Sequence, residues 1–178
     1  EGDPKIILMG GRYQLYFSET FFNNGVGGIE NGARRWKNFV SLKESSLAAH
    51  LRETIQYVLD LGHYLVFVNS IPEAGWDVPQ KLHLESVKKK LGIEGDTDNR
   101  LSTDMTKYLD RANPAMQVVA GIAHPRLLTV NPASLLCDRE TQKCFVDSDG
   151  QIFYVDHDHM SQYGAKLIND LILDSFPQ

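Results

Sequence analysis

The chain is organised around residues 152–165, Ile152-Phe-Tyr-Val-Asp-His-Asp-His-Met-Ser-Gln-Tyr-Gly-Ala165. The apolar run 152–155 predicts a strand, and apolar side chains at helical spacing from Leu167 to Phe176 predict a helix. Between the two lie two carboxylates and two imidazoles within four residues. A strand and a helix on either side of a polar turn form a rigid scaffold of the kind that holds chemically active side chains.

Asp156 and His159 stand three residues apart in this turn. A tight turn at that spacing folds the carboxylate onto the imidazole, which fixes the tautomer of the ring and stabilises its protonated form. The other ring nitrogen can then take a proton from a nucleophile. One interpretation of the spacing is therefore an Asp–His pair for nucleophilic catalysis.

The same cluster has two other interpretations. Ser161 would cap the following helix and Asp158 would favour its positive end, in which case the turn is structural. Asp-His-Asp-His also offers four good metal ligands, but adjacent residues rarely converge on one ion, and the sequence contains neither HExxH nor CxxC. We therefore expect no metal site.

The bulk composition is that of an ordinary globular protein. A length of 178 residues fits one domain, and we expect a single domain over residues 1–178. The net charge of -5 leaves no basic stripe to neutralise phosphates, so we expect no nucleic-acid partner. No apolar run approaches the roughly 18 residues of a membrane span. No signal peptide is visible, although the chain can be a piece excised from a longer protein.

Cys137 and Cys144 enclose the short polar loop Asp-Arg-Glu-Thr-Gln-Lys. A disulfide would close such a loop across a hairpin-like turn, and it would indicate an oxidising compartment. Zinc would need two further soft ligands that the neighbouring sequence does not obviously supply. A reduced pair in the cytosol is the other alternative, and a disulfide is favoured over both.

Short apolar runs alternate with helical patterns along the chain. Strands are predicted at 5–9, 64–68 and 127–130, and helices at 45–61, 80–91, 102–112 and 116–122, the last two interrupted near Pro114. We also expect a hairpin around Asp149-Gly150. The run at 5–9 is interpreted as a buried strand, and the lysines at 88–90 as a solvated helix face. The alternation predicts a mostly parallel sheet with helices on both faces.

In open sheets of this kind the functional site lies beyond the carboxyl ends of the strands. Four segments would gather there: Gly10-Gly11, Asn69-Ser70, Asn131 and Asp156–His159. Glycines at a strand end let backbone N–H groups approach a ligand. Arg12, directly after them, could supply a cation or hydrogen bonds.

Asp156-x-x-His159-Met-Ser-x-x-Gly164-Ala165 resembles the C-terminal Asp-x-x-His block of SGNH hydrolases, the GDSL-like esterases. The similarity is greatest to SGNH domains fused behind acyltransferase family 3 membrane proteins, which O-acylate bacterial cell-surface glycans. Further matching segments are Ile6-Ile-Leu-Met-Gly-Gly-Arg12 with Tyr16, Phe22-Asn-Asn-Gly-Val-Gly-Gly28, Ile71-Pro-Glu73, Gly75-Trp-Asp-Val-Pro79 and the cysteine-bracketed loop. The resemblance covers most of the chain and implies that Asp156 and His159 are catalytic.

One block of the family has no counterpart. The Gly-Asp-Ser block, whose serine is the nucleophile, is absent, since Gly2-Asp3 is followed by Pro4. The resemblance therefore implies a domain truncated at its N-terminus, without its first strand–helix unit, or a domain that is inactive as it stands. Ser70 is the in-chain candidate for a substitute nucleophile.

Arg12 stands where the family's Gly-x-Asn-Asp block would supply an oxyanion-hole asparagine. The resemblance thus leaves the backbone N–H of Gly11, the side chain of Arg12 and Ser70 as candidates for oxyanion or substrate binding. Trp76 is a candidate sugar-stacking platform, and a core role fits it as well.

The resemblance implies an α/β fold, the three-layer α/β/α SGNH-hydrolase (flavodoxin-like) fold with a mostly parallel sheet. It implies an extracytoplasmic domain, tethered to the membrane by an acyltransferase domain in the same parent chain. The reaction would be O-acyl transfer, most often O-acetyl transfer, from an acyl donor to a surface polysaccharide through a Ser-His-Asp acyl-enzyme, with the serine outside this chain and no cofactor. A carbohydrate esterase of the same fold and a non-catalytic glycan-binding module are the alternatives.

Overall fold

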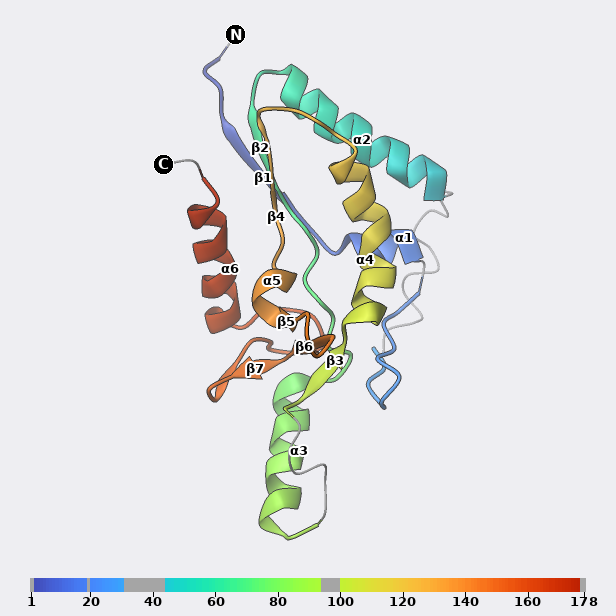
Figure 1. Cartoon of the computed structure of the whole chain (residues 1–178), viewed down its shortest axis with the longest axis vertical. Helices are drawn as coiled ribbons and strands as arrows, with labels where there is room; N and C mark the ends of the chain where they lie inside the picture. The colour runs from blue at the N-terminus through green and yellow to red at the C-terminus, as the bar shows by residue number, and fades with distance from the viewer. Residues whose placement is uncertain (1, 19, 31–43, 94–99, 177–178) are drawn as a thin grey trace.

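The computed structural model describes residues 2–18, 20–30, 44–93 and 100–176 (Figure 1). Its helices are α1 (Tyr13–Ser18), α2 (Glu44–Asp60), α3 (Val78–Lys90), α4 (Met105–Ala120), α5 (Ala133–Leu136) and α6 (Gln162–Asp174). Its strands are β1 (Ile6–Gly10), β2 (Tyr64–Val68), β3 (Ser102–Asp104), β4 (Leu127–Val130), β5 (Cys137–Asp138), β6 (Lys143–Phe145), β7 (Asp147–Ser148) and β8 (Gln151–Ile152). Within the described ranges, no helix is long and apolar enough to cross a membrane.

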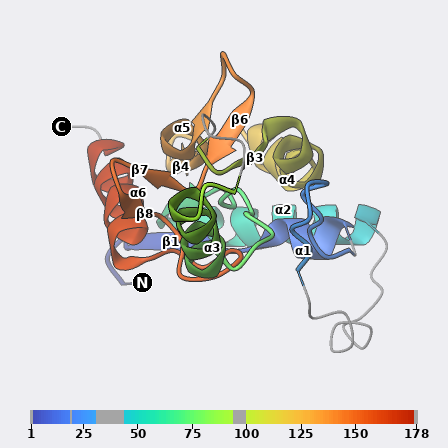
Figure 2. The same ribbon diagram turned by 90° about the horizontal axis from the view of Figure 1, so that it is seen from below.

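A three-stranded parallel sheet of order β1-β2-β4 forms the centre of the molecule. The side chains of Leu65 and Phe67 in β2 are fully buried, and they pack against Ile55 and Leu59 of α2 and Val119 of α4. Figures 1 and 2 show α6 on the other side of the sheet from α2 and α4. The predicted α/β class, with a parallel sheet flanked by helices, is confirmed.

The prediction that the first apolar run is a buried strand is wrong for one of its faces. Ile6 and Leu8 are 61% and 60% exposed, whereas Ile7 and Met9 pack into the core with α2 and β2. Successive side chains of a strand point to opposite faces of the sheet. Within the described residues β1 is an edge strand, and the face that carries Ile6 and Leu8 is left open.

A second, antiparallel sheet of order β3-β6-β5 was not predicted. Cys137 pairs with Cys144 across β5 and β6, and their sulfurs form the predicted disulfide, which excludes both zinc and a reduced pair. The prediction of a helix from Ser102 is wrong, because residues 102–104 form β3 against β6. The side chain of Asp104 then caps α4 by accepting a 2.7 Å hydrogen bond from the backbone N–H of Thr106.

Two further boundary predictions are wrong. Helix α4 runs through Pro114 without interruption, and its buried Ala112 and Ala115 on either side show that tertiary packing outweighs the hydrogen bond that proline removes. The strand predicted at 152–155 ends at Ile152 as β8, which pairs with β7 rather than with the parallel sheet. The predicted hairpin at Asp149-Gly150 is confirmed, with both residues at the positive φ that its turn requires.

Candidate active site

The turn after β8 is closed by its own backbone and by one carboxylate. The N–H of Val155 donates a 2.9 Å hydrogen bond to the carbonyl of His159. Asp156 Oδ1 accepts hydrogen bonds from the backbone N–H groups of Asp158, at 3.0 Å, and of His159, at 2.8 Å. A short polar side chain that satisfies the amides two and three residues later is the usual way to hold such a turn.

The second oxygen of Asp156 makes the expected contact with the imidazole. Asp156 Oδ2 lies 2.8 Å from His159 Nδ1, and since a carboxylate only accepts, Nδ1 carries the proton and donates a hydrogen bond to Asp156. The side chain of His159 is 74% exposed, and in the part of the chain that the structure describes its Nε2 has no hydrogen-bond partner. The pair thus has the arrangement of a general base, and its catalytic role stays a prediction.

The pKa values of the pair move apart. The hydrogen bond from Asp156 is the main cause that raises the pKa of His159, with the charge of Asp158 second. Burial opposes ionisation of Asp156, but the hydrogen bonds from the Asp158 and His159 amides and from the His159 ring outweigh it and lower the pKa of that carboxyl. Both shifts favour a carboxylate beside an imidazolium.

Substituting Asp156→Asn is expected to lower the pKa of His159 towards the ordinary value of about 6.5. The folded chain should therefore bind this proton more weakly, and the ring should lose its charge at a lower pH than in the unsubstituted protein. An NMR titration of the ring protons of His159 measures this directly. Asp170→Asn on α6, where the carboxylate bonds to Lys166, is the matched control and should leave the titration unchanged. An unchanged titration in Asp156→Asn would contradict the pairing.

Asp158 joins the pair to a cationic side chain. Its Oδ1 lies 3.5 Å from His159 Nδ1, and its Oδ2 lies 2.8 Å from Arg12 Nη1. Burial is the main cause that raises the pKa of Asp158, against the opposing charge of Arg12. Through this ion pair the end of β1 contacts the turn, as the gathering of strand ends predicts.

Arg12 is engaged by two further carboxylates. It donates to Glu30 Oε1 at 2.7 Å and, from Nε, to Glu73 Oε1 at 2.8 Å. Glu73 is 2% exposed and also binds Arg111 of α4, whose Nε lies 2.8 Å from Glu73 Oε2. The predicted use of Arg12 as an oxyanion donor would compete with these carboxylates. Sequence reasoning gave no role to Glu30, Glu73 or Arg111, because no local spacing connects them, although Glu73 lies in one of the segments that resemble the family.

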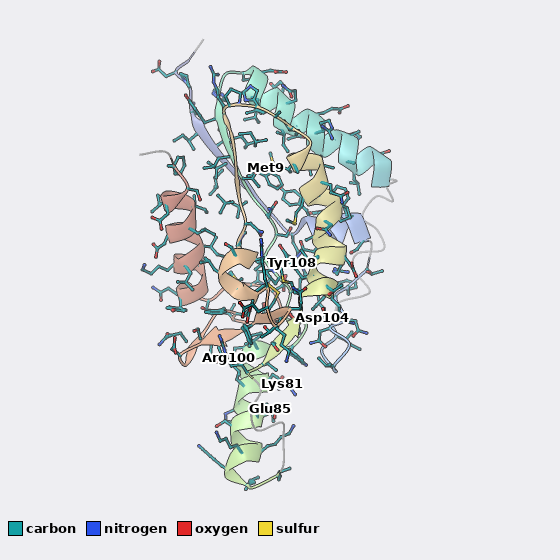
Figure 3. The ribbon with its side chains drawn as sticks, viewed as in Figure 1. Met9, Lys81, Glu85, Arg100, Asp104 and Tyr108 are labelled. Atoms are coloured by element: carbon teal, nitrogen blue, oxygen red, sulfur yellow. A yellow bond between two sulfur atoms is a disulfide. The ribbon has the colours of Figure 1, made fainter. Side chains whose placement is uncertain are left out.

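Ser70 and Gly11 lie together at the carboxyl ends of the strands, as predicted. The Ser70 hydroxyl donates to the Gly11 carbonyl at 2.9 Å and accepts from the N–H of Tyr13 at 3.1 Å. Tyr108 of α4, labelled in Figure 3, donates a 3.0 Å hydrogen bond to the Ser70 carbonyl. These bonds give Ser70 a structural role, and none of them leads to His159.

Ser161 caps α6, as predicted. Its hydroxyl accepts from the N–H of Gly164 at 3.1 Å and donates to the carbonyl of Ile152 at 2.6 Å. Gly164 lets this helix approach the preceding segment, because a Cβ there would clash with the carbonyl oxygen of Phe153. The helix that follows the turn is therefore held against β8 by its first residues.

The segment that carries Trp76 lies against the same turn. The N–H of Ala74 donates to the carbonyl of His157 at 2.8 Å, and the N–H of Val78 donates to the carbonyl of Asp156 at 3.4 Å. The Trp76 ring is half-buried, and the ammonium of Lys81 lies 5.9 Å from the ring centroid. The predicted sugar platform is thus placed beside the turn, and its binding role stays a prediction.

Asp156, His157 and Asp158 offer possible metal ligands within 4.8 Å of one another. Asp156 already accepts two backbone hydrogen bonds and one from His159, and Asp158 is paired with Arg12. An ion bound there would compete with the guanidinium for Asp158. The donor set therefore fits a proton-transfer pair better than a cation site.

The structure defines an α/β protein with a three-stranded parallel sheet flanked by helices, in which a hydrogen-bonded Asp–His pair lies in the turn before α6. The model of the SGNH domain family, described as fused to AT3 domains, matches residues 1–174. The chain therefore belongs to this family of SGNH domains. No curated protein and no solved structure matches it.

Proposed function

We propose that the chain is the extracytoplasmic SGNH domain of an O-acyltransferase, with acetyl as the transferred group, that modifies a bacterial cell-surface polysaccharide. The observation that carries this proposal is the hydrogen bond between Asp156 and an exposed His159 in a chain of this family. The disulfide between Cys137 and Cys144 supports a location in an oxidising compartment. We assign the whole of 1–178 to one domain with the three-layer α/β/α SGNH fold.

In the proposed reaction a serine hydroxyl outside this chain attacks the carbonyl carbon of the acyl donor. His159 Nε2 takes the serine proton as the new C–O bond forms, then gives it to the leaving group of the donor. A sugar hydroxyl of the acceptor next attacks the acyl-serine, again losing its proton to His159, and the serine leaves with that proton. Asp156 holds the ring and stabilises its charge in both halves.

The oxyanion that forms in each half needs donors. The backbone N–H of Gly11 is the candidate in this chain, because β1 ends beside the turn through the Arg12–Asp158 ion pair. The membrane acyltransferase domain named in the family description is the proposed source of the acyl group.

The test uses the full-length protein, incubated with an activated acetyl ester in the presence and absence of a glycan acceptor. We expect a mass increase of one acetyl group on a serine, followed by its transfer to the glycan. Release of free acetate at the same rate with and without acceptor would favour the carbohydrate esterase. If the protein forms no acetyl adduct and shows no turnover but still binds glycan, the result would favour the non-catalytic glycan-binding module.

A further inference from the structure

A groove of about 890 Å³ runs between α3, the small antiparallel sheet and the loop at 24–26. Its walls are helix α3, residues 100–104 around β3, the first turn of α4 and the tip of the hairpin at 141–143. Figure 3 labels four of its side chains, Lys81 and Glu85 on α3 and Arg100 and Asp104 around β3. This volume lies in the upper part of the range of about 300–1,000 Å³ for ligand sites, so it has room for more than one sugar unit.

Among the described residues that line this groove, basic side chains outnumber acidic ones. Its described basic residues are Lys81, Lys88, Lys89, Arg100, Lys107 and Lys143, and its described acidic residues are Glu85, Asp104 and Asp147. The chain as a whole carries a formal charge of -5. A cleft lined by one sign of charge concentrates ligands of the other sign.

Of the three described carboxylates in the groove, Glu85 and Asp147 have basic partners, and Asp104 accepts a hydrogen bond from the backbone. Glu85 binds Lys81 at 2.8 Å and Lys88 at 3.1 Å. Asp104 caps α4, and Asp147 lies 3.8 Å from Arg100.

The ammonium groups of Lys89, Lys107 and Lys143 have no ion-pair partner within the described ranges. They come from helix α3, helix α4 and strand β6, so three separate elements direct positive charge to one groove. The lysines interpreted from the sequence as a solvated helix face therefore belong in part to the wall of a groove.

An aromatic ring lines the groove, and the segment that carries it contacts the turn at 156–159. Trp76 lines the groove, and its segment is hydrogen-bonded through Ala74 and Val78 to the backbone of His157 and Asp156. An aromatic face combined with ammonium groups suits a sugar that carries an anionic group, because the ring stacks on the apolar face of the sugar and the cations bind its charge.

We propose that this groove, defined by the residues above, binds the anionic groups of an acidic glycan, and that it holds the acceptor of the proposed transferase beside His159. That the bound glycan is the acceptor rests on the proposed function, whereas the binding itself rests on the groove alone. The anionic group is a carboxylate or a phosphate on the sugar. Nucleic acid is disfavoured because paired carboxylates interrupt the basic residues, and a nucleic-acid site uses a continuous phosphate-binding track.

The test titrates the chain, by calorimetry at low and high salt, with a short oligogalacturonate, a neutral malto-oligosaccharide of the same length, a glycerol-phosphate oligomer and a single-stranded oligonucleotide. We expect at least one of the two anionic glycan probes to bind more tightly than the neutral probe, with affinity that falls as salt rises. Comparison of the dissociation constants of the oligogalacturonate and the glycerol-phosphate oligomer then shows whether the groove prefers a carboxylate or a phosphate.

The variant Lys89→Gln/Lys107→Gln/Lys143→Gln should raise the dissociation constant of the anionic glycan about tenfold. Lys166→Gln, at the ion pair with Asp170 on α6, removes a lysine outside the groove and should leave it unchanged. Four results would each overturn the proposal. The neutral probe could bind as tightly as the anionic glycans, or the triple variant could bind the anionic glycan with unchanged affinity. Neither anionic glycan could bind, or the oligonucleotide could bind more tightly than both. His159→Ala is expected to lower acyl turnover but to bind the anionic glycan with unchanged affinity. This variant therefore tests the groove separately from the proposed catalysis.

Discussion

His159→Ala is expected to lower acyl turnover of the full-length protein by about 10³-fold, the range in which a positioned general base contributes. In the proposed mechanism the imidazole takes the proton of the nucleophile. Its side chain is largely exposed, and its Nδ1 is held by Asp156. The measurement is the rate of acetyl transfer from an activated ester, with folding checked by circular dichroism.

The adjacent histidine provides the matched control for this experiment. His157 contributes its backbone carbonyl to Ala74 and Gly75, and within the described residues its ring makes no hydrogen bond. His157→Ala should therefore leave turnover within a few-fold of the unsubstituted protein. Equal rates in the His159 variant and the unsubstituted protein would remove His159 from the mechanism, whatever happens at residue 157.

Glu73→Gln is expected to lower the free energy of unfolding by about 3 kcal/mol, the cost of breaking a buried ion pair by removing one partner. Glu73 is 2% exposed and neutralises both Arg12 and Arg111. The variant removes the counterion of the largely buried guanidinium of Arg111, which keeps its hydrogen bonds to Thr20. Urea denaturation measures the change as a lower midpoint with an unchanged slope.

Glu85→Gln is the control for this change in stability, because Glu85 pairs with Lys81 and Lys88 on the exposed side of α3. Exposed ion pairs contribute little to stability, so we expect no measurable shift of the midpoint. An equally stable Glu73→Gln variant would show that the Arg12–Glu73–Arg111 cluster does not hold the site together.

The elements that the sequence predicts correctly are those whose cause is local. The contact between Asp156 and His159 needs only a three-residue spacing in a turn. The disulfide needs only a short loop between Cys137 and Cys144. The run 64–68 is apolar at every position, and such runs form central strands of parallel sheets.

The predictions that failed depend on distant partners. Residues 102–104 form a strand because β6, about forty residues later, is there to pair with them. Pro114 stays inside α4 because its neighbours are buried against other elements. The face of β1 that carries Ile6 and Leu8 is exposed, because burial of a strand face depends on which element covers it. Among the described residues, no element covers this face.

The sequence by itself determined the class of the fold, the disulfide and the contact between Asp156 and His159, since each follows from periodicity or from neighbours a few residues apart. Only the tertiary structure decided that Arg12 is surrounded by Glu30, Glu73 and Asp158, and that lysines from three elements line one groove beside Trp76. The physical reason is that charges interact through space, over distances set by packing, while spacing along the chain describes only the local backbone.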